Sequence, residues 1–185
     1  MLIIGITGTL GAGKGTIVEY LVNQKNFTHY SVRSFLIEEI ESREMQVNRD
    51  SMVIIANELR AKHSPSYVTD QLYFKALISG ENCVIESIRT PGEVDSLREK
   101  ANFFLFAIDA PSQLRYERIL LRNSETDNIN YETFVQNEQR EMNTSDPAKQ
   151  NLRKCIEMAD FIFENSGSIN ELQLKVEEVL HQIEK

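Results

Sequence analysis

The chain alternates short apolar runs with longer segments in which apolar residues recur every three or four positions. Short runs bounded by glycine or polar residues are typical of buried strands, and the longer period is typical of amphipathic helices. The sequence predicts five strands, at residues 2–7, 27–32, 82–87, 103–108 and 161–163. Helical patterns separate consecutive strands, so we expect an α/β fold with a parallel sheet and helices on both faces.

The predicted helices differ in how clearly their ends are marked. They span residues 16–23, 34–43, 50–62, 67–79, 91–100, 112–122, 131–142, 147–158 and a last segment from 168. Pro91 suits a first helical turn, and Ser168 with Glu171 forms a capping-box pattern. Residues 123–130 are polar without an apolar period, which predicts a loop.

A glycine-rich turn follows the first predicted strand directly. The turn and the start of the next helix comprise Gly8, Thr9, Leu10, Gly11, Ala12, Gly13, Lys14, Gly15 and Thr16. Glycines let backbone N–H groups close around a phosphate, and a helix N-terminus adds partial positive charge there. We expect Lys14 to reach the β- and γ-phosphates of a nucleotide and Thr16 to hold Mg²⁺. The strand, turn and helix together predict a phosphate-binding loop.

Composition narrows the class of protein. The chain has 185 residues, of which 41% are apolar and 26% charged, as in ordinary globular domains. Its formal net charge of −8 makes a nucleic-acid partner unexpected. The two cysteines have neither metal-site nor redox-motif spacing. No apolar run is long enough to cross a membrane, and we expect no targeting segment. We therefore expect a cytoplasmic protein without a membrane partner.

The motif Gly-x-x-Gly-x-Gly-Lys-Gly-Thr resembles the phosphate-binding loop of adenylate-kinase-like nucleoside monophosphate kinases, in which the extra Gly15 is usual. The resemblance covers nearly the whole chain and extends more loosely to dephospho-CoA kinases. Glu86 and Arg89 match the acidic residue and the arginine that follow the family's third strand. Residues 110–122 match its arginine-bearing helix before a mobile lid, and residues 164–168 match a turn that contacts the donor base.

The resemblance implies a P-loop three-layer sandwich with a five-stranded parallel sheet, formed by one domain over residues 1–185. A helical acceptor-binding insert is expected at about 31–79 and a lid at about 122–145. ATP is the implied donor, Mg²⁺ the implied cofactor, and a small phosphorylated molecule the implied acceptor.

Specific roles follow from this resemblance and from the residue types. We expect the catalytic residues to be Lys14, Arg89, Arg118 and Arg122. The expected ATP-binding residues are Gly8, Gly11, Ala12, Gly13, Lys14, Gly15, Thr16, Arg115 and Asn165. The expected acceptor-binding residues are Arg33, Arg60, Glu86 and Arg89, and the expected Mg²⁺ ligands are Thr16 and Glu86. Arg115, Arg118 and Arg122 share one helical face, where like charges repel unless an anion offsets them.

The acceptor side departs from the family's pattern. Ser31-Val32-Arg33 stands where a Gly-Asp-x-x-Arg run is typical, and Glu86 stands where Asp is usual. Two other functions therefore remain open: a dephospho-CoA kinase-like enzyme, and a regulatory nucleotide-dependent ATPase without a small acceptor. The first is disfavoured because Ser31 cannot act as the base that a sugar hydroxyl needs. The acceptor's base and sugar, the choice of ATP or GTP, and the oligomeric state are not determined by the sequence.

Overall fold

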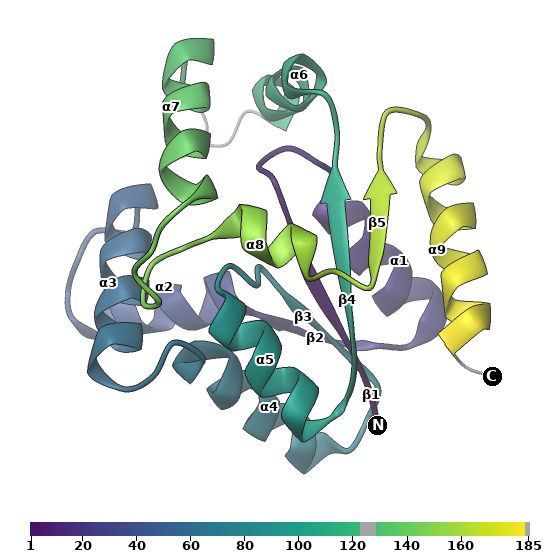
Figure 1. Cartoon of the computed structure of the whole chain (residues 1–185), viewed down its shortest axis with the longest axis horizontal. Helices are drawn as coiled ribbons and strands as arrows, with labels where there is room; N and C mark the ends of the chain where they lie inside the picture. The colour runs from purple at the N-terminus through teal and green to yellow at the C-terminus, as the bar shows by residue number, and fades with distance from the viewer. Residues whose placement is uncertain (123–128, 184–185) are drawn as a thin grey trace.

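The computed structural model describes residues 1–122 and 129–183. In these residues one parallel sheet contains five strands, in the order β2-β3-β1-β4-β5 (Figure 1). The strands are β1 (Leu2–Gly8), β2 (Thr28–Ser31), β3 (Cys83–Glu86), β4 (Asn102–Asp109) and β5 (Phe161–Glu164). The predicted fold class is confirmed.

Helices cover both faces of the sheet. They are α1 (Lys14–Lys25), α2 (Val32–Ser42), α3 (Arg49–Lys62), α4 (Tyr67–Ser79), α5 (Pro91–Lys100), α6 (Ser112–Arg122), α7 (Tyr131–Met142), α8 (Leu152–Glu157) and α9 (Ile169–Ile183). Alternate residues of β1 serve the two faces: Ile3 packs with α2–α5 and α8, whereas Ile4 and Ile6 pack with α1 and α9. Burial on both faces explains why the strands read as continuous apolar runs.

Side-chain caps account for the start of α9, which the sequence predicted, and for the start of α8, which it placed too early. The Ser168–Glu171 capping box is present at the start of α9. The helix expected over 147–158 is shorter, because the Asn151 side chain caps α8 by accepting from the Lys154 N–H. A capping box between Thr90 and Glu93, in addition to Pro91 in the first turn, starts α5.

The carboxyl ends of β1 and β3 lie at one edge of the sheet, beside the regions expected to form the insert and the lid. Residues 31–79 contain α2, α3 and α4, on the side of β2 and β3 (Figure 1). The described part of the expected lid contains α7, which lies next to α6 and near α3, while residues 123–128 lie outside the described residues (Figure 1). In an open α/β sheet this edge is where ligands bind.

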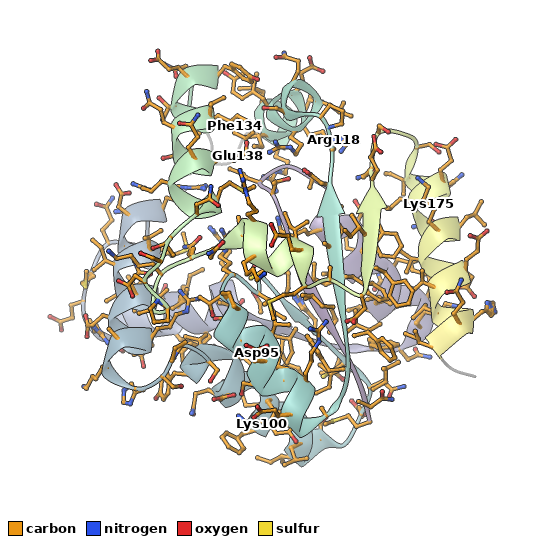
Figure 2. All side chains as sticks on the ribbon, in the orientation of Figure 1. Asp95, Lys100, Arg118, Phe134, Glu138 and Lys175 are labelled. Atoms are coloured by element: carbon orange, nitrogen blue, oxygen red, sulfur yellow. The ribbon has the colours of Figure 1, made fainter. Side chains whose placement is uncertain are left out.

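Aromatic side chains join α7 to α6. Phe134 of α7 packs against the ring of Tyr116, and Tyr131 forms an edge contact with the same ring. Figure 2 shows Phe134 and Glu138 of α7 beside α6, on which Arg118 lies. The α6–α7 pair is therefore held by its own contacts above the sheet edge. No helix in the described part of the chain is long and apolar enough to cross a membrane.

Candidate active site

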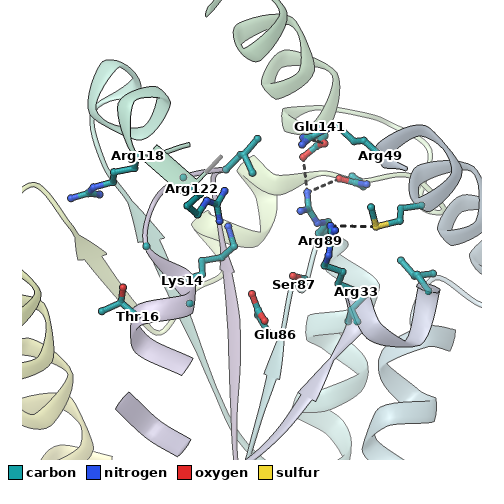
Figure 3. A pocket seen from close by; sticks show the side chains of 18 of the residues that line it. Lys14, Thr16, Arg33, Arg49, Glu86, Ser87, Arg89, Arg118, Arg122 and Glu141 are labelled. Carbon is teal, nitrogen blue, oxygen red and sulfur yellow. Dashed lines mark hydrogen bonds and ion pairs between the residues drawn. The ribbon is translucent and has the colours of Figure 1, made fainter. Parts of the chain in front are cut away.

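A cavity of about 720 Å³ opens at the carboxyl edge of the sheet (Figure 3). Its cationic lining residues are Lys14, Arg33, Arg49, Arg60, Arg89, Arg118 and Arg122. The carboxylates that line it are Glu19, Glu86 and Glu141. Cations outnumber carboxylates in this lining, so the cavity suits an anionic occupant.

The predicted phosphate-binding loop forms one end of the cavity. Gly8, Gly11 and Gly13 have φ values of 130°, 79° and 100°, which favour glycine. A Cβ at Gly8 or Gly11 would collide with the backbone of Ile108 or Arg115. Gly13 caps α1 without a side-chain hydrogen bond, so the first N–H groups of the helix are available to an anion.

Lys14 folds back over this loop. Its Nζ donates to the carbonyl oxygens of Gly8 at 3.0 Å and Thr9 at 2.7 Å. Desolvation and the nearby charge of Arg89 lower the pKa of Lys14 to about 7, although Glu86 and Glu141 act in the opposite direction. The phosphates of a nucleotide would favour the charged amine, because an opposite charge nearby raises the pKa of a lysine.

Arg115 lies outside the lining of this cavity, although it was expected to bind the nucleotide. Its buried guanidinium donates to the carbonyl oxygens of Ala110 at 2.7 Å and Leu10 at 3.2 Å, and to Glu138 at 2.8 Å. These contacts join α6, the phosphate-binding loop and α7. Fold-level resemblance could not separate this positioning role from direct contact, because both place an arginine beside the loop.

Asn165 and Arg118 lie where the loop meets the end of β5. The Asn165 Nδ2 donates to the Ala12 carbonyl oxygen at 2.8 Å, and Arg118 donates to the Asn165 carbonyl oxygen at 3.0 Å. Both residues line the cavity, as does Arg122. The Arg118 Nη1 is buried and has no hydrogen-bond partner among the described residues. Arg118 therefore retains a donor for a ligand.

Glu86 ends β3 and faces the same cavity as Lys14 (Figure 3). The His29 Nε2 lies 3.2 Å from the Glu86 carboxylate. Burial by itself raises the pKa of Glu86, but His29, Lys14 and Arg89 outweigh it and hold that pKa below its usual value. Ser87, the next residue, has a φ of 70°, a left-handed conformation that is uncommon outside glycine and recurs at functional sites.

The described residues suit a Mg²⁺ ion that takes most of its ligands from water and phosphate. The Thr16 hydroxyl and the Glu86 carboxylate line one cavity, and both are oxygen donors of the kind that Mg²⁺ prefers. No group of three or more His, Cys, Asp or Glu residues suited to a metal ion occurs in the described ranges. A Mg²⁺ ion there would take its remaining oxygens from water and phosphate, as is usual in kinase sites.

The other end of the cavity contains a carboxylate that the sequence did not single out. Glu141 of α7 accepts from Arg49 at 2.5 Å and from Arg89 at 2.6 Å (Figure 3). Arg89 also donates to Gln150 at 3.0 Å. Burial alone raises the pKa of Glu141, but the two guanidinium groups outweigh it and lower that pKa. No sequence signal marks Glu141 or Gln150, since their partners lie on distant segments.

Arg33 and Arg60, both expected to bind the acceptor, reach this part of the cavity in different settings. Arg33 of α2 lines the cavity and donates to the Met52 sulfur at 3.5 Å. Arg60 is almost fully buried and donates to Glu93 at 2.9 Å, so its charge is already compensated. The structure thus brings the predicted residues Arg33, Arg60, Glu86 and Arg89 together with the phosphate-binding loop in one cavity.

The chain is similar to known proteins over nearly its whole length. The chain is 28% identical over 197 residues to the UPF0200 protein MJ1399 of Methanocaldococcus jannaschii, covering 100% of this chain and 94% of that protein. TT1252 from Thermus thermophilus has a similar structure, with a TM-score of 0.66 at 19% identity over 98% of this chain and 97% of that one. Dephospho-CoA kinase from Campylobacter jejuni aligns with a TM-score of 0.51 at 15% identity over 98% and 96%.

The likenesses to solved structures show the fold, and they confirm the resemblance to P-loop kinases. The family match is broader than half of the chain: it covers residues 4–146, from β1 through the phosphate-binding loop to α7. The chain therefore belongs to the AAA domain family AAA_18, whose members share this P-loop kinase-like domain.

Proposed function

We propose that the protein is an ATP-dependent phosphotransferase that moves the γ-phosphoryl group of ATP to a nucleoside or deoxynucleoside monophosphate. One observation carries the proposal: a single cavity joins the phosphate-binding loop to a cluster of arginines from α2, α3 and the segment after β3. A protein that only bound or hydrolysed ATP would need the loop but not this second cluster. The second cluster offers a place for a second anion beside the first.

The two ends of the cavity divide the work of phosphoryl transfer. The reaction needs two reactants held in line and the charge of the transferring group neutralised. Lys14 and the loop N–H groups bind the donor phosphates, and Arg118 and Arg122 add positive charge above them. Thr16 and Glu86 would hold Mg²⁺, which would supply charge neutralisation to the phosphates.

The acceptor phosphate is assigned to the other end. Arg33, Arg49 and Arg89 line the cavity there, and a planar guanidinium matches two phosphate oxygens at once. An acceptor phosphate must compete with the Glu141 carboxylate, which now occupies Arg49 and Arg89. Closure and opening of α7 over this end would then accompany acceptor binding, as in other lidded enzymes.

A phosphate acceptor suits the site better than a hydroxyl acceptor does. Attack by a hydroxyl benefits from a carboxylate base, whereas a phosphate oxygen is already anionic. At the end of β2 the Ser31 hydroxyl caps α2 by accepting from the Ser34 N–H, and no carboxylate stands in its place. Glu86, the carboxylate at the end of β3, is assigned to Mg²⁺.

A screen of ADP formation from ATP and Mg²⁺ tests the proposal. The panel contains the ribo- and deoxyribonucleoside monophosphates, with dephospho-CoA and simple sugars as hydroxyl acceptors. We expect ADP formation that depends on a monophosphate and is lost in Lys14→Met. Stimulation by a hydroxyl acceptor alone would overturn the acceptor assignment. ATP turnover unaffected by any acceptor would instead support a regulatory ATPase.

A further inference from the structure

The face of α3 that lines the cavity is cationic at its two ends and apolar between them. Arg49 and Arg60 stand at the ends, separated by about three helical turns, or roughly 16 Å. The lining residues between them are apolar and are joined by two from α2: Met52, Val53, Ala56, Val32 and Leu36. An occupant that matches this wall presents an apolar surface between two polar ends. A nucleotide does so: the flat face of its base is apolar, while its phosphate and the far edge of its base are polar.

The two ends of this wall are not electrically equivalent. At the Arg49 end, Arg49 and Arg89 share one carboxylate, Glu141. At the other end Arg60 has a carboxylate to itself: its side chain is 1% exposed, and that of Glu93, 2.9 Å away, is 0% exposed. A phosphate therefore gains more at the Arg49 end. The compensated Arg60–Glu93 pair is better suited to an uncharged polar group.

One arm of the Arg60 guanidinium lacks a hydrogen bond. Its Nε and Nη2 both donate to the same Glu93 oxygen, at 3.2 and 2.9 Å. Because the guanidinium is planar, these two donors share one edge, and Nη1 lies on the other side of the group. Nη1 is buried without a partner among the described residues, and Arg60 lines the cavity. Buried donors nearly always have a partner, so an occupant of the cavity is the candidate for this one.

The chemistry of that partner is restricted. Arginine carries donors and no acceptor, so Nη1 can pair only with an acceptor atom. A carbonyl oxygen satisfies it, whereas an amino group at the same position would place donor against donor. A site with a buried polar group discriminates strongly against an analogue that leaves the group unpaired.

We propose that Arg60 is a specificity-determining residue whose Nη1 donates to a carbonyl oxygen on the acceptor's base. The inference rests on the proposed function and deepens it: the enzyme prefers a base with an oxo group at that position over the same base with an amino group. Glu93 orients Arg60 and cancels its charge, so the subsite selects a neutral oxygen instead of a second phosphate.

Two matched pairs of acceptors test this preference in the unaltered enzyme. Inosine and adenosine 5′-monophosphates differ by oxo against amino at one ring position and by N–H against a bare nitrogen at the adjacent one, as do uridine and cytidine 5′-monophosphates. Because arginine only donates, the bare ring nitrogen of the amino members cannot by itself produce a preference for the oxo members. The measurement is kcat/KM for ADP formation with each. We expect at least a tenfold preference for the oxo member in the pair that the enzyme accepts. Equal use of both members, or preference for the amino member, would overturn the inference and leave the proposed function standing.

Arg60→Lys tests the assignment to this residue. Lysine keeps a positive charge for Glu93 but has no second arm, so the oxo preference should fall below about threefold. Arg98→Lys is the matched control: Arg98 pairs with Asp160 away from the cavity, and its preference should equal that of the unaltered enzyme. Thermal melting and ATP affinity establish that both variants are folded.

The outcomes separate the two proposals. A preference that persists in Arg60→Lys would assign the selection elsewhere and overturn the inference alone. Failure of every monophosphate in the ribo- and deoxyribonucleotide panel to stimulate ADP formation, with ATP binding retained, would overturn the proposed function and this inference with it. Activity with a monophosphate of that panel but with none of the four in the matched pairs would leave the proposed function standing and overturn this inference alone. Should Arg60→Lys not fold, the comparison of acceptor pairs in the unaltered enzyme still decides whether an oxo group is selected.

Discussion

The buried Arg60–Glu93 pair should be a stability determinant whose two members cannot be removed independently. Glu93 accepts from Arg60 through one oxygen and from the N–H groups of Arg89 and Thr90, at 2.8 and 3.0 Å, through the other. It therefore ties α3, α5 and the segment after β3 together. Glu93→Gln keeps the shape of the side chain, but its amide N–H₂ then faces either the Arg60 guanidinium or the two backbone N–H groups. It also leaves Arg60 without its counter-charge.

The expected magnitude follows from the burial of both side chains, at 1% and 0% exposed. Breaking such a pair costs about 3–5 kcal/mol, because a charge is left in the interior without compensation. With a urea m-value of about 2 kcal/mol/M, a loss of that size lowers the unfolding midpoint by about 1.5–2.5 M. Arg60→Met should also destabilise, since it leaves the Glu93 carboxylate supported only by backbone N–H groups.

A double-mutant cycle distinguishes the pair from two separate contacts. The assay is urea unfolding followed by far-UV circular dichroism, for both single variants and for the double variant. The double variant should be no less stable than Glu93→Gln, with a coupling energy of about 2 kcal/mol or more. The control is Glu58→Gln, which is on α3 like Arg60 and removes only an exposed ion pair with Arg43. It should shift the midpoint little. Single-variant losses that add within about 0.5 kcal/mol would refute the reasoning.

The remaining predictions concern the two ends of the cavity. Lys14→Met should remove about 2–4 kcal/mol of transition-state stabilisation, measured as a fall in kcat/KM. Lys25→Met on the same helix should leave kcat/KM unchanged, and similar rates for both variants would contradict the loop assignment. Glu86→Gln should weaken the Mg²⁺ dependence of the rate more than ATP binding, and an unchanged Mg²⁺ titration would remove Glu86 from the metal site. Arg89→Ala should raise the acceptor KM and leave the ATP Kd nearly unchanged, and loss of ATP affinity instead would show that the cavity ends are assigned wrongly. Glu141→Gln should destabilise by about 2 kcal/mol at pH 7. Since the folded pKa of Glu141 lies below its usual value, that stabilisation is present at pH values above the unfolded pKa and is lost as pH falls through the folded pKa. Unfolding curves of the two proteins should therefore converge in acid, and a constant difference would contradict this account.

Much of the fold could be predicted because its signals are local. Apolar runs such as Phe103–Ile108 identify buried strands, and the loop around Lys14 needs a strand before it and a helix after it in any such fold. The start of α8 was misplaced because it depends on a side-chain cap. Asn151 shortens α8 by bonding to a backbone N–H three residues on, which an apolar pattern does not register.

The site was predictable to the extent that its residues belong to a motif. Lys14, Thr16, Glu86 and Arg89 meet in one cavity because parallel strands bring their carboxyl ends to one edge. Arg115 shows the limit of this reasoning: it was expected to bind ATP, but its guanidinium is instead bonded to Leu10 and Glu138, which depends on how α6 and α7 pack.

The order of residues is enough to predict the alternation of strands and helices, the phosphate-binding loop and the number of arginines available to bind anions. How those charges are used depends on which distant segments pack together. Arg60 is paired with Glu93, while Arg49 and Arg89 share Glu141, a residue that had no distinguishing signal. The physical reason is that hydrophobic periodicity is written along one segment, whereas an ion pair depends on the distance between segments. Packing of α3, α5 and α7 sets those distances.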